Sequence, residues 1–193
     1  MRLFVAVDVT DDVRAHAEQV RRRVVRAMTV ADRGLRWVKA GELHLTLRFI
    51  GEVDAETGSL IGEAMAEPLP MPAFTVGIGR PAWIPGPSRP RVLMLQLRSG
   101  AEQLRSLFGI VEHRLVDVAS LPPEPRPFLA HLTLARVRDT ERRRVADSAH
   151  LLTDAVFGDG PEFTVRAVTL YESQLSPDGP TYTPLAQGRL IEA

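Results

Sequence analysis

The four residues HLTL occur twice in the sequence, as His44–Leu47 within RWVKAGELHLTLRFIGEV and as His131–Leu134 within FLAHLTLAR. The second copy begins 87 residues after the first, so each half of the chain carries one copy. Polar and apolar residues alternate through both copies, which predicts a strand in each. Side chains alternate between the two faces of a strand, so His and Thr share one face and the leucines share the other. We expect the leucines to be buried against helices and the imidazoles and hydroxyls to face the opposite way.

Outward from the two motifs, strands and helices alternate in two halves of similar length. There is no glycine fingerprint of a dinucleotide-binding fold and no phosphate-binding P-loop. We therefore expect an α+β fold in which residues 1–193 form one domain of two pseudo-symmetric lobes. Each lobe is expected to be an antiparallel sheet with helices on its outer face, and the lobes flank a central cleft. The expected strands are 2–8, 35–38, 43–50, 74–78, 91–98, 131–137, 163–172 and 182–191, the helices 11–28, 54–67, 100–115 and 140–156, and the Pro-rich loops 81–90 and 121–127.

The composition excludes several classes of protein. The chain has no Cys, which rules out disulfides, thiolate metal sites and a cysteine nucleophile. Lys plus Arg is 24 and Asp plus Glu is 24, so no overall basic field attracts nucleic acid, and an anionic ligand must be held by local groups. Of the basic residues only Lys39 is lysine. No stretch approaches the roughly 18 apolar residues of a membrane span and no signal segment opens the chain, so we expect a cytoplasmic monomer with no membrane partner.

Two His–Thr pairs facing each other suit a displacement reaction at phosphorus. One imidazole can act as general base on the attacking oxygen, and the other, protonated, can act as general acid on the leaving oxygen. Hydroxyl and guanidinium donors can hold the non-bridging oxygens and stabilise the charge that develops there. The sequence offers no carboxylate cluster for a cation, so we expect neither a metal nor a cofactor.

The paired H-x-T-x motifs resemble the signature of the two-histidine (2H) phosphoesterase superfamily. The chain is most similar to its RNA 2′,3′-cyclic phosphodiesterases, also called 2′-5′ RNA ligases. The resemblance extends over nearly the whole chain. It includes the opening MRLFVAVDV, both HLTL segments and the closing LYESQLSPDGPTYTPLA.

This resemblance implies hydrolysis of a 2′,3′-cyclic phosphate at an RNA 3′ end, which leaves a 2′-phosphate. It implies that His44 is the general acid on the 3′ leaving oxygen and that His131 activates water. Thr46 and Thr133 would bind the phosphate oxygens, and Arg136 would add a charged donor. The implied partners are RNA 3′ ends or small nucleotides that carry a cyclic phosphate.

Strict alternation raises a difficulty for Arg136, because the fifth residue after His131 falls on the wrong face of an unbroken strand. Arg48, the fourth residue after His44, falls on the same face as that histidine. A bulge or the end of the strand could turn Arg136 to the face that carries His131, so the roles of the two arginines stay open. Phe49 and Trp37 are candidates for stacking on a base, although aromatic residues in strands usually belong to the core.

Other functions stay open as well. A related phosphoesterase could act with the same four residues on 2′-5′ linked oligonucleotides or on the cyclic phosphate of a nucleotide-sugar. A non-catalytic module that binds RNA ends is a further alternative, although binding alone would not require two titrating groups. Ligation is the reverse reaction, but dilute aqueous conditions favour hydrolysis.

Overall fold

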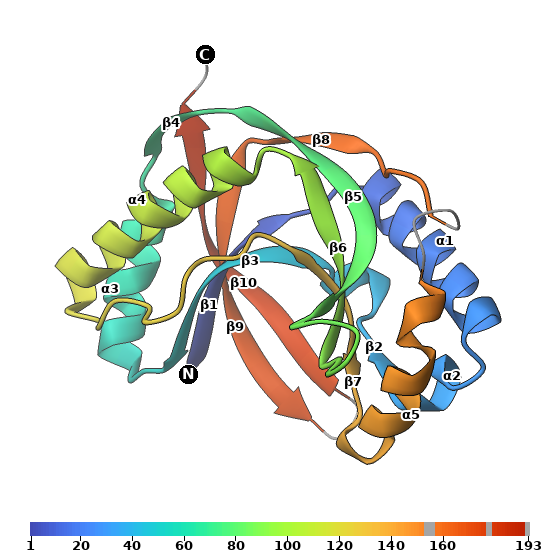
Figure 1. The fold of residues 1–193 in the computed structure, drawn as a ribbon. Coiled ribbons are helices and arrows are strands. Elements are labelled where there is room, and N and C mark those ends of the chain that lie inside the picture. Colours follow the sequence, from blue (N-terminus) through green and yellow to red (C-terminus); the bar gives the residue numbers. More distant parts are fainter. Residues whose placement is uncertain (153–156, 177–178, 192–193) are drawn as a thin grey trace.

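The two HLTL strands lie next to each other in the middle of a ten-stranded sheet (Figure 1). The computed structural model describes residues 1–152, 157–176 and 179–191. Its strands are β1 (Arg2–Asp8), β2 (Leu35–Trp37), β3 (His44–Glu52), β4 (Leu69–Pro72), β5 (Phe74–Ile84), β6 (Val92–Ser99), β7 (Leu132–Val137), β8 (Glu162–Val165), β9 (Ala167–Ser176) and β10 (Gly179–Ile191). Their order is β4-β10-β9-β1-β3-β7-β6-β5-β8, and β2 pairs with β7. All neighbours are antiparallel except β4 and β10, which are parallel.

The sheet has two halves that meet at a single residue pair. Leu45 on β3 faces Leu132 on β7, and no other residue pair joins these two strands in the described sheet. We call this pair the seam. The first lobe contains β4, β10, β9, β1 and β3, and the second contains β7, β6, β5 and β8 with β2. The two antiparallel sheets expected from the sequence are therefore present, and they are joined edge to edge through the two motifs.

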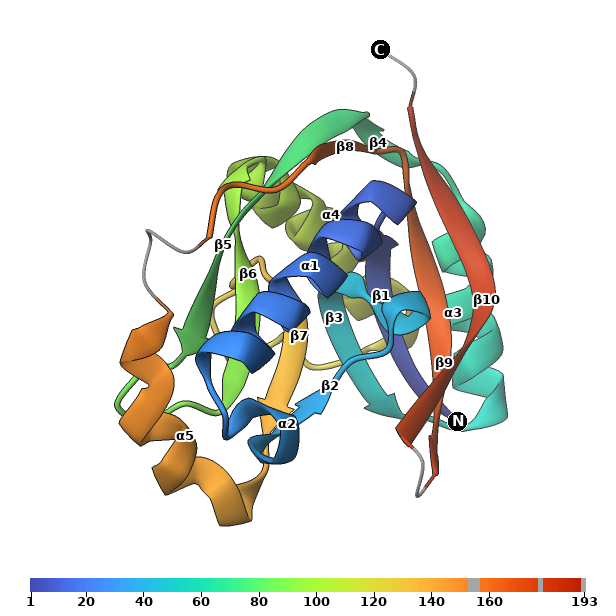
Figure 2. The ribbon, with the colours of Figure 1, turned by 90° about the vertical axis from the view of Figure 1, so that its right-hand side faces the viewer.

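The helices lie on the outer faces of the lobes (Figures 1 and 2). They are α1 (Asp11–Ala27), α2 (Ala31–Gly34), α3 (Ala55–Ala66), α4 (Ala101–Ala119) and α5 (Arg142–Ser148), with 3-10 turns η1 (Ala40–Glu42), η2 (Asp139–Glu141) and η3 (Ala149–Leu151). Helices α3 and α4 cover the first lobe, whereas α1, α2 and α5 cover the second. Helix α1 follows a first-lobe strand and α4 follows a second-lobe strand, so these two helices cross over and interlock the lobes. No helix in the described ranges combines the length and the apolarity needed to cross a membrane.

The motif leucines form part of the core beneath the helices. Leu45, Leu47, Leu132 and Leu134 are all at most 4% exposed. This burial confirms the face predicted for them by strand alternation. The opposite face of the sheet, which we call the inner face, carries the histidines and threonines of both motifs.

Four elements differ from the sequence expectation. Strand β4 forms in a Pro-rich segment that was not expected to be a strand, and the single strand expected at 163–172 is divided into β8 of the second lobe and β9 of the first. Strand β5 runs on to Ile84 through part of the expected loop, and Pro81 is tolerated because β8 pairs only with the first four residues of β5. The helix expected at 140–156 is divided into η2, α5 and η3. The Ser148 hydroxyl donates a hydrogen bond to the backbone carbonyl of Arg144, a contact that competes with regular helix bonding where α5 ends. Residues 153–156 of that expected helix lie outside the described residues.

Candidate active site

The seam brings the four polar motif residues together. The seam pair, Leu45 and Leu132, is flanked by His44 and Thr46 on one chain segment and by His131 and Thr133 on the other. Since the two strands are antiparallel, His44 and Thr133 flank the seam at one end, and Thr46 and His131 flank it at the other. The two histidines therefore flank the seam at opposite ends, one on each side of it. All four side chains are partly exposed on the inner face. A phosphate group placed over the seam can therefore be reached from both strands.

Both histidines are oriented by the same backbone contact. The ring nitrogen Nδ1 of His44 lies 2.7 Å from the carbonyl oxygen of Glu42, and Nδ1 of His131 lies 2.8 Å from the carbonyl oxygen of Leu129. A carbonyl oxygen only accepts hydrogen bonds, so Nδ1 carries the proton in each ring. Nε2 is therefore the atom that each imidazole offers for proton transfer. The two copies thus present the same tautomer from opposite sides of the seam.

His44 lies in an aromatic environment of the first lobe. Its ring centroid is 4.9 Å from that of Phe4 and 5.4 Å from that of Tyr182. Burial lowers the pKa of His44, with smaller opposing effects from its hydrogen bond to Glu42 and from the carboxylate of Asp8. The charges of Arg136 and of His131 also lower this pKa.

Asp8 is a site residue that the sequence analysis did not single out. It pairs with His44 between β1 and β3. Its carboxylate accepts hydrogen bonds from the hydroxyls of Thr169 at 2.8 Å and Tyr171 at 2.6 Å. Burial, followed by the hydrogen bond to Asp8, raises the pKa of Tyr171, so this phenol stays a donor. These contacts hold the carboxylate beside His44. Tyr171 and Tyr182 both lie in the closing segment that carried the resemblance, and that segment was the feature of the sequence that could have pointed to them.

A β-bulge interrupts each motif strand at the same position. Leu47 has no partner on β1, and Leu134 has none on β6. Each bulge places two buried residues in succession, which shifts the fifth residue after the histidine to the inner face. Phe49 takes this position in the first copy and is 46% exposed, and Arg136 takes it in the second. The bulge is how Arg136 comes to share the face of His131 and Thr133.

The same bulge makes the expected orientation of Arg48 wrong. Arg48 lies on the outer face and is only 8% exposed, so it cannot reach a ligand at the seam. Its Nε is 2.6 Å from Glu112 on α4, and one terminal nitrogen is 2.9 Å from Glu124. The other terminal nitrogen donates to the carbonyl oxygen of Pro122 at 2.6 Å.

Arg48 thereby fixes the chain segment that leads into the second motif. The backbone amide of Glu124 also donates to the carboxylate of Glu112, so α4 and the Pro-rich segment share one polar network. Further along, the ring of Phe128 stacks on that of Phe108 of α4, with centroids 4.8 Å apart. The approach to His131 is therefore anchored on the outer face of the first lobe.

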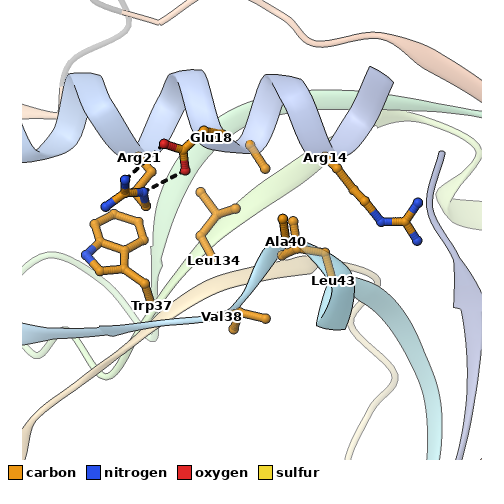
Figure 3. A pocket seen from close by; sticks show the side chains of 9 residues that line it. Arg14, Glu18, Arg21, Trp37, Val38, Ala40, Leu43 and Leu134 are labelled. Carbon is orange, nitrogen blue, oxygen red and sulfur yellow. Dashed lines mark hydrogen bonds and ion pairs between the residues drawn. The ribbon is translucent and has the colours of Figure 1, made fainter. Parts of the chain in front are cut away.

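Trp37 lies on the outer face beneath α1, and the expectation that it could stack on a base is wrong. It lines a narrow pocket between α1 and the loop after β2 (Figure 3). The guanidinium carbon of Arg21 lies 5.9 Å from the ring centroid, and Arg21 is held in turn by Glu18. Trp37 pairs with Ala135 next to the bulge, so its ring faces the same way as the buried motif residues.

The threonine hydroxyls face the seam without competing contacts. In the part of the chain that the structure describes, neither Thr46 nor Thr133 makes a side-chain hydrogen bond. Both hydroxyls can therefore donate to a ligand oxygen. Among the same residues, no group of three His, Cys, Asp or Glu side chains is placed to hold a metal ion.

The chain is similar to known proteins over nearly its whole length. The chain is 32% identical over 185 residues to the RNA 2′,3′-cyclic phosphodiesterase of Archaeoglobus fulgidus, covering 96% of this chain and 98% of that protein. It is 29% identical over 192 residues to the protein of the same name from Escherichia coli K12, covering 99% and 97%.

Solved structures show the same fold. A Thermus thermophilus protein superposes with a TM-score of 0.73 at 26% identity, covering 100% of this chain and 99% of that chain. The E. coli LigT structure in complex with 3′-AMP also gives a TM-score of 0.73 at 26% identity, covering 99% and 98%. The model of the LigT-like phosphoesterase family matches residues 7–94 and 96–182 of this chain. These matches confirm the resemblance seen in the sequence, and the chain belongs to the LigT-like phosphoesterase family.

Proposed function

We propose that this protein hydrolyses RNA 2′,3′-cyclic phosphate ends to 2′-phosphomonoesters, without a metal ion, by general acid and base catalysis from His44 and His131. The observation that carries the proposal is the arrangement at the seam. Two imidazoles, each with Nδ1 on a backbone carbonyl and Nε2 available, flank the single residue pair that joins β3 and β7, and each is followed two residues later by a threonine. The names of the relatives support the choice of substrate.

The chemical step needs one proton removed and one supplied. Nε2 of His131 takes a proton from water as the water oxygen forms a bond to phosphorus. The bond between phosphorus and the ribose 3′-oxygen breaks, and Nε2–H of His44 gives its proton to that oxygen. The product keeps the 2′-ester bond as a 2′-phosphomonoester. His131 ends protonated and His44 neutral, so a proton exchange with solvent resets the pair.

Three donors would stabilise the charge that develops on the phosphate. The hydroxyls of Thr46 and Thr133 flank the seam on opposite strands, and Arg136 adds a guanidinium on the same face. Donors placed before reaction at the position of a developing oxyanion contribute typically 10²–10³-fold each. The ligand also acts on His44, because a phosphate anion beside a buried imidazole favours its protonated form and opposes the lowered pKa.

Small nucleotides are a second ligand class for the same site. Structures of E. coli LigT are described in complex with 3′-AMP and with ATP. The inner face near His44 offers aromatic rings as well as donors, which suits a nucleoside. We therefore include small nucleotides that carry a cyclic phosphate among the substrates.

The test is incubation with a short RNA that ends in a 2′,3′-cyclic phosphate, in EDTA, followed by phosphorus NMR. We expect a 2′-phosphate as the sole product, which would establish the regiochemistry and the independence from metal together. An unchanged cyclic end would overturn the proposal and direct attention to 2′-5′ linked oligonucleotides and nucleotide-sugar cyclic phosphates. A 3′-phosphate product would reverse the assignment of the leaving oxygen.

A further inference from the structure

Three arginines share the inner face of the second lobe beside the seam. Arg36 on β2 pairs with Arg136 on β7, and residues paired in this way point to the same face. Arg138 follows two residues after Arg136, with the buried Val137 between them, so it lies on the inner face as well. All three arginines are exposed. We call them the arginine cluster.

The arginine cluster has no counter-ion in the described part of the chain. The neighbouring acids are committed elsewhere, since Asp139 pairs with Arg142 and Glu141 pairs with Arg144. Like charges directly opposite each other on a sheet are destabilising. The chain as a whole is neutral, with 24 basic and 24 acidic residues, so this concentration of positive charge is local. A site that binds an anion explains such an arrangement better than a solvated surface does.

The arginine cluster lies on the side of the seam where the nucleoside would sit. This step rests on the proposed function, in which water attacks opposite the 3′-oxygen and His44 protonates that oxygen. The ribose carries the leaving oxygen, so it must lie on the His44 side. Arg136 belongs to that side as well, because β7 runs from Leu132 at the seam to Arg136, and in an antiparallel pair this direction leads past His44, where β3 begins.

We infer that Arg36 and Arg138 form a subsite for the phosphate on the 5′-oxygen of the terminal nucleotide, next to the cyclic phosphate held at the seam. Arg136 stands between the two phosphates and Arg36 is its cross-strand neighbour. In an RNA this 5′-phosphate is the diester to the preceding nucleotide, and in a mononucleotide it is a monoester. The subsite makes the enzyme selective for ends that carry this phosphate. Arg suits the role because its planar fork binds phosphate oxygens in pairs.

Three substrates with the same cyclic end measure this selectivity. They are adenosine 2′,3′-cyclic phosphate, the same compound with a 5′-phosphate, and the adenosine dinucleotide with a terminal cyclic phosphate. We expect kcat/KM to be about tenfold or more higher for the two substrates that carry the additional phosphate, since charge-assisted hydrogen bonds are the stronger ones. A gain confined to the dinucleotide would overturn the inference, because it would assign recognition to the second nucleoside.

Charge-neutralising variants locate the subsite. In Arg36→Gln and Arg138→Gln, we expect the ratio of kcat/KM between substrates with and without the 5′-phosphate to fall about five- to tenfold. The slope of log kcat/KM against log salt for the dinucleotide should become shallower by about 0.7 per lost contact. The matched control is Arg189→Gln, an exposed arginine seven residues along β10 from Tyr182, about 23 Å away. An equal fall of the ratio in this control, or no fall in either variant, would overturn the inference.

Failure of the proposed function is separable from failure of the subsite. If the wild type hydrolyses none of the three substrates, the proposed function has failed. The subsite is then decided by calorimetric binding of adenosine 3′,5′-bisphosphate against adenosine 3′-monophosphate. We expect the bisphosphate to bind about tenfold more tightly to the wild type and to lose this gain in Arg36→Gln. Equal affinity of the two ligands for the wild type would refute the subsite.

Discussion

The two copies of HLTL have the same local backbone but differ in the two residues that follow them. Both copies hold Nδ1 on a backbone carbonyl two residues upstream, and both contain a bulge at the second leucine. After the bulge the first copy continues with Arg48 and Phe49, and the second with Ala135 and Arg136. One position is buried and the other faces the inner side in each copy. The shared residues are suited to proton transfer, whereas the divergent pair gives each lobe its own contacts.

The two histidines also differ in the side chains that surround them. His44 packs against the rings of Phe4 and Tyr182, whereas no aromatic contact of His131 occurs among the described residues. The first lobe therefore presents an aromatic inner face, and the second presents arginines. The proposed pair of catalytic histidines is thus set between two unlike surfaces, an arrangement that suits an asymmetric ligand such as a nucleotide.

The largest expected effect comes from removing either histidine. His44→Ala and His131→Ala should each lower kcat by about 10²–10⁴-fold, the usual contribution of one acid or base group. The measurement is kcat on an RNA cyclic phosphate end, with circular dichroism to establish that the variants are folded. Wild-type rates in either variant would contradict the two-histidine mechanism.

The same pair of variants can separate the two roles. A substrate with sulfur in place of the 3′-oxygen needs no protonation of its leaving group. It should restore much of the lost rate in His44→Ala and none in His131→Ala. Recovery in His131→Ala instead would show that the acid and the base are exchanged between the copies.

Arg48, the buried residue of the divergent pair in the first copy, should affect the stability of the fold. Arg48→Met leaves Glu112 without its cation and leaves Glu124 with only the exposed Arg126, and removing one partner of a buried ion pair typically costs about 3–5 kcal/mol. The measurement is the free energy of unfolding in urea. The control Arg22→Met removes a surface ion pair with Glu18 and should cost less than about 1 kcal/mol. Adding Glu112→Gln to Arg48→Met should recover part of the loss, and a purely additive loss would contradict the network.

The exposed residue of the divergent pair is Arg136 in the second copy and Phe49 in the first. We expect Arg136 to matter more for catalysis than Phe49. Arg136→Gln should lower kcat/KM about 10- to 100-fold, because a charged donor to the phosphate is lost. Phe49→Leu keeps an apolar side chain at the equivalent position and should change kcat/KM less than about threefold. A larger effect from Phe49→Leu would mean that the first copy, and not the second, holds the ligand at this position.

The smallest expected effect is a shift in the pH profile through Asp8. Its carboxylate raises the pKa of His44, so Asp8→Asn should lower that pKa further below its ordinary value. Because His44 acts in its protonated form, the alkaline limb of kcat/KM should then move to lower pH, and an NMR titration of the His44 ring should follow it. Asp12→Asn, an exposed acid at the start of α1, serves as the control and should leave both unchanged. A limb that stays in place or moves to higher pH would show that Asp8 does not act on His44.

The sequence contained enough to predict the motif strands, the buried leucines and the two-lobed α+β fold. It could not predict which face Arg48 and Arg136 take, because alternation assumes a regular strand and a bulge has no residue signature in HLTL. Nor could it place Asp8 beside Tyr171, since β1 and β9 pair across more than 160 residues and no local pattern records that pairing. Local periodicity is readable from sequence, whereas register between distant strands is set by the assembled core.

The position of β1 between β3 and β9 determines when, during synthesis, the residues around His44 can come together. The amino-terminal strand is among the first to leave the ribosome, yet one of its two neighbours is made among the last. At about 5–20 residues per second, the roughly 40 residues from the end of β7 to the end of β9 take about 2 to 8 seconds. Both histidines have been synthesised before that interval begins, whereas Tyr171 is made near its end and Tyr182 after it. A nascent chain therefore carries both motifs well before the surroundings of His44 are complete.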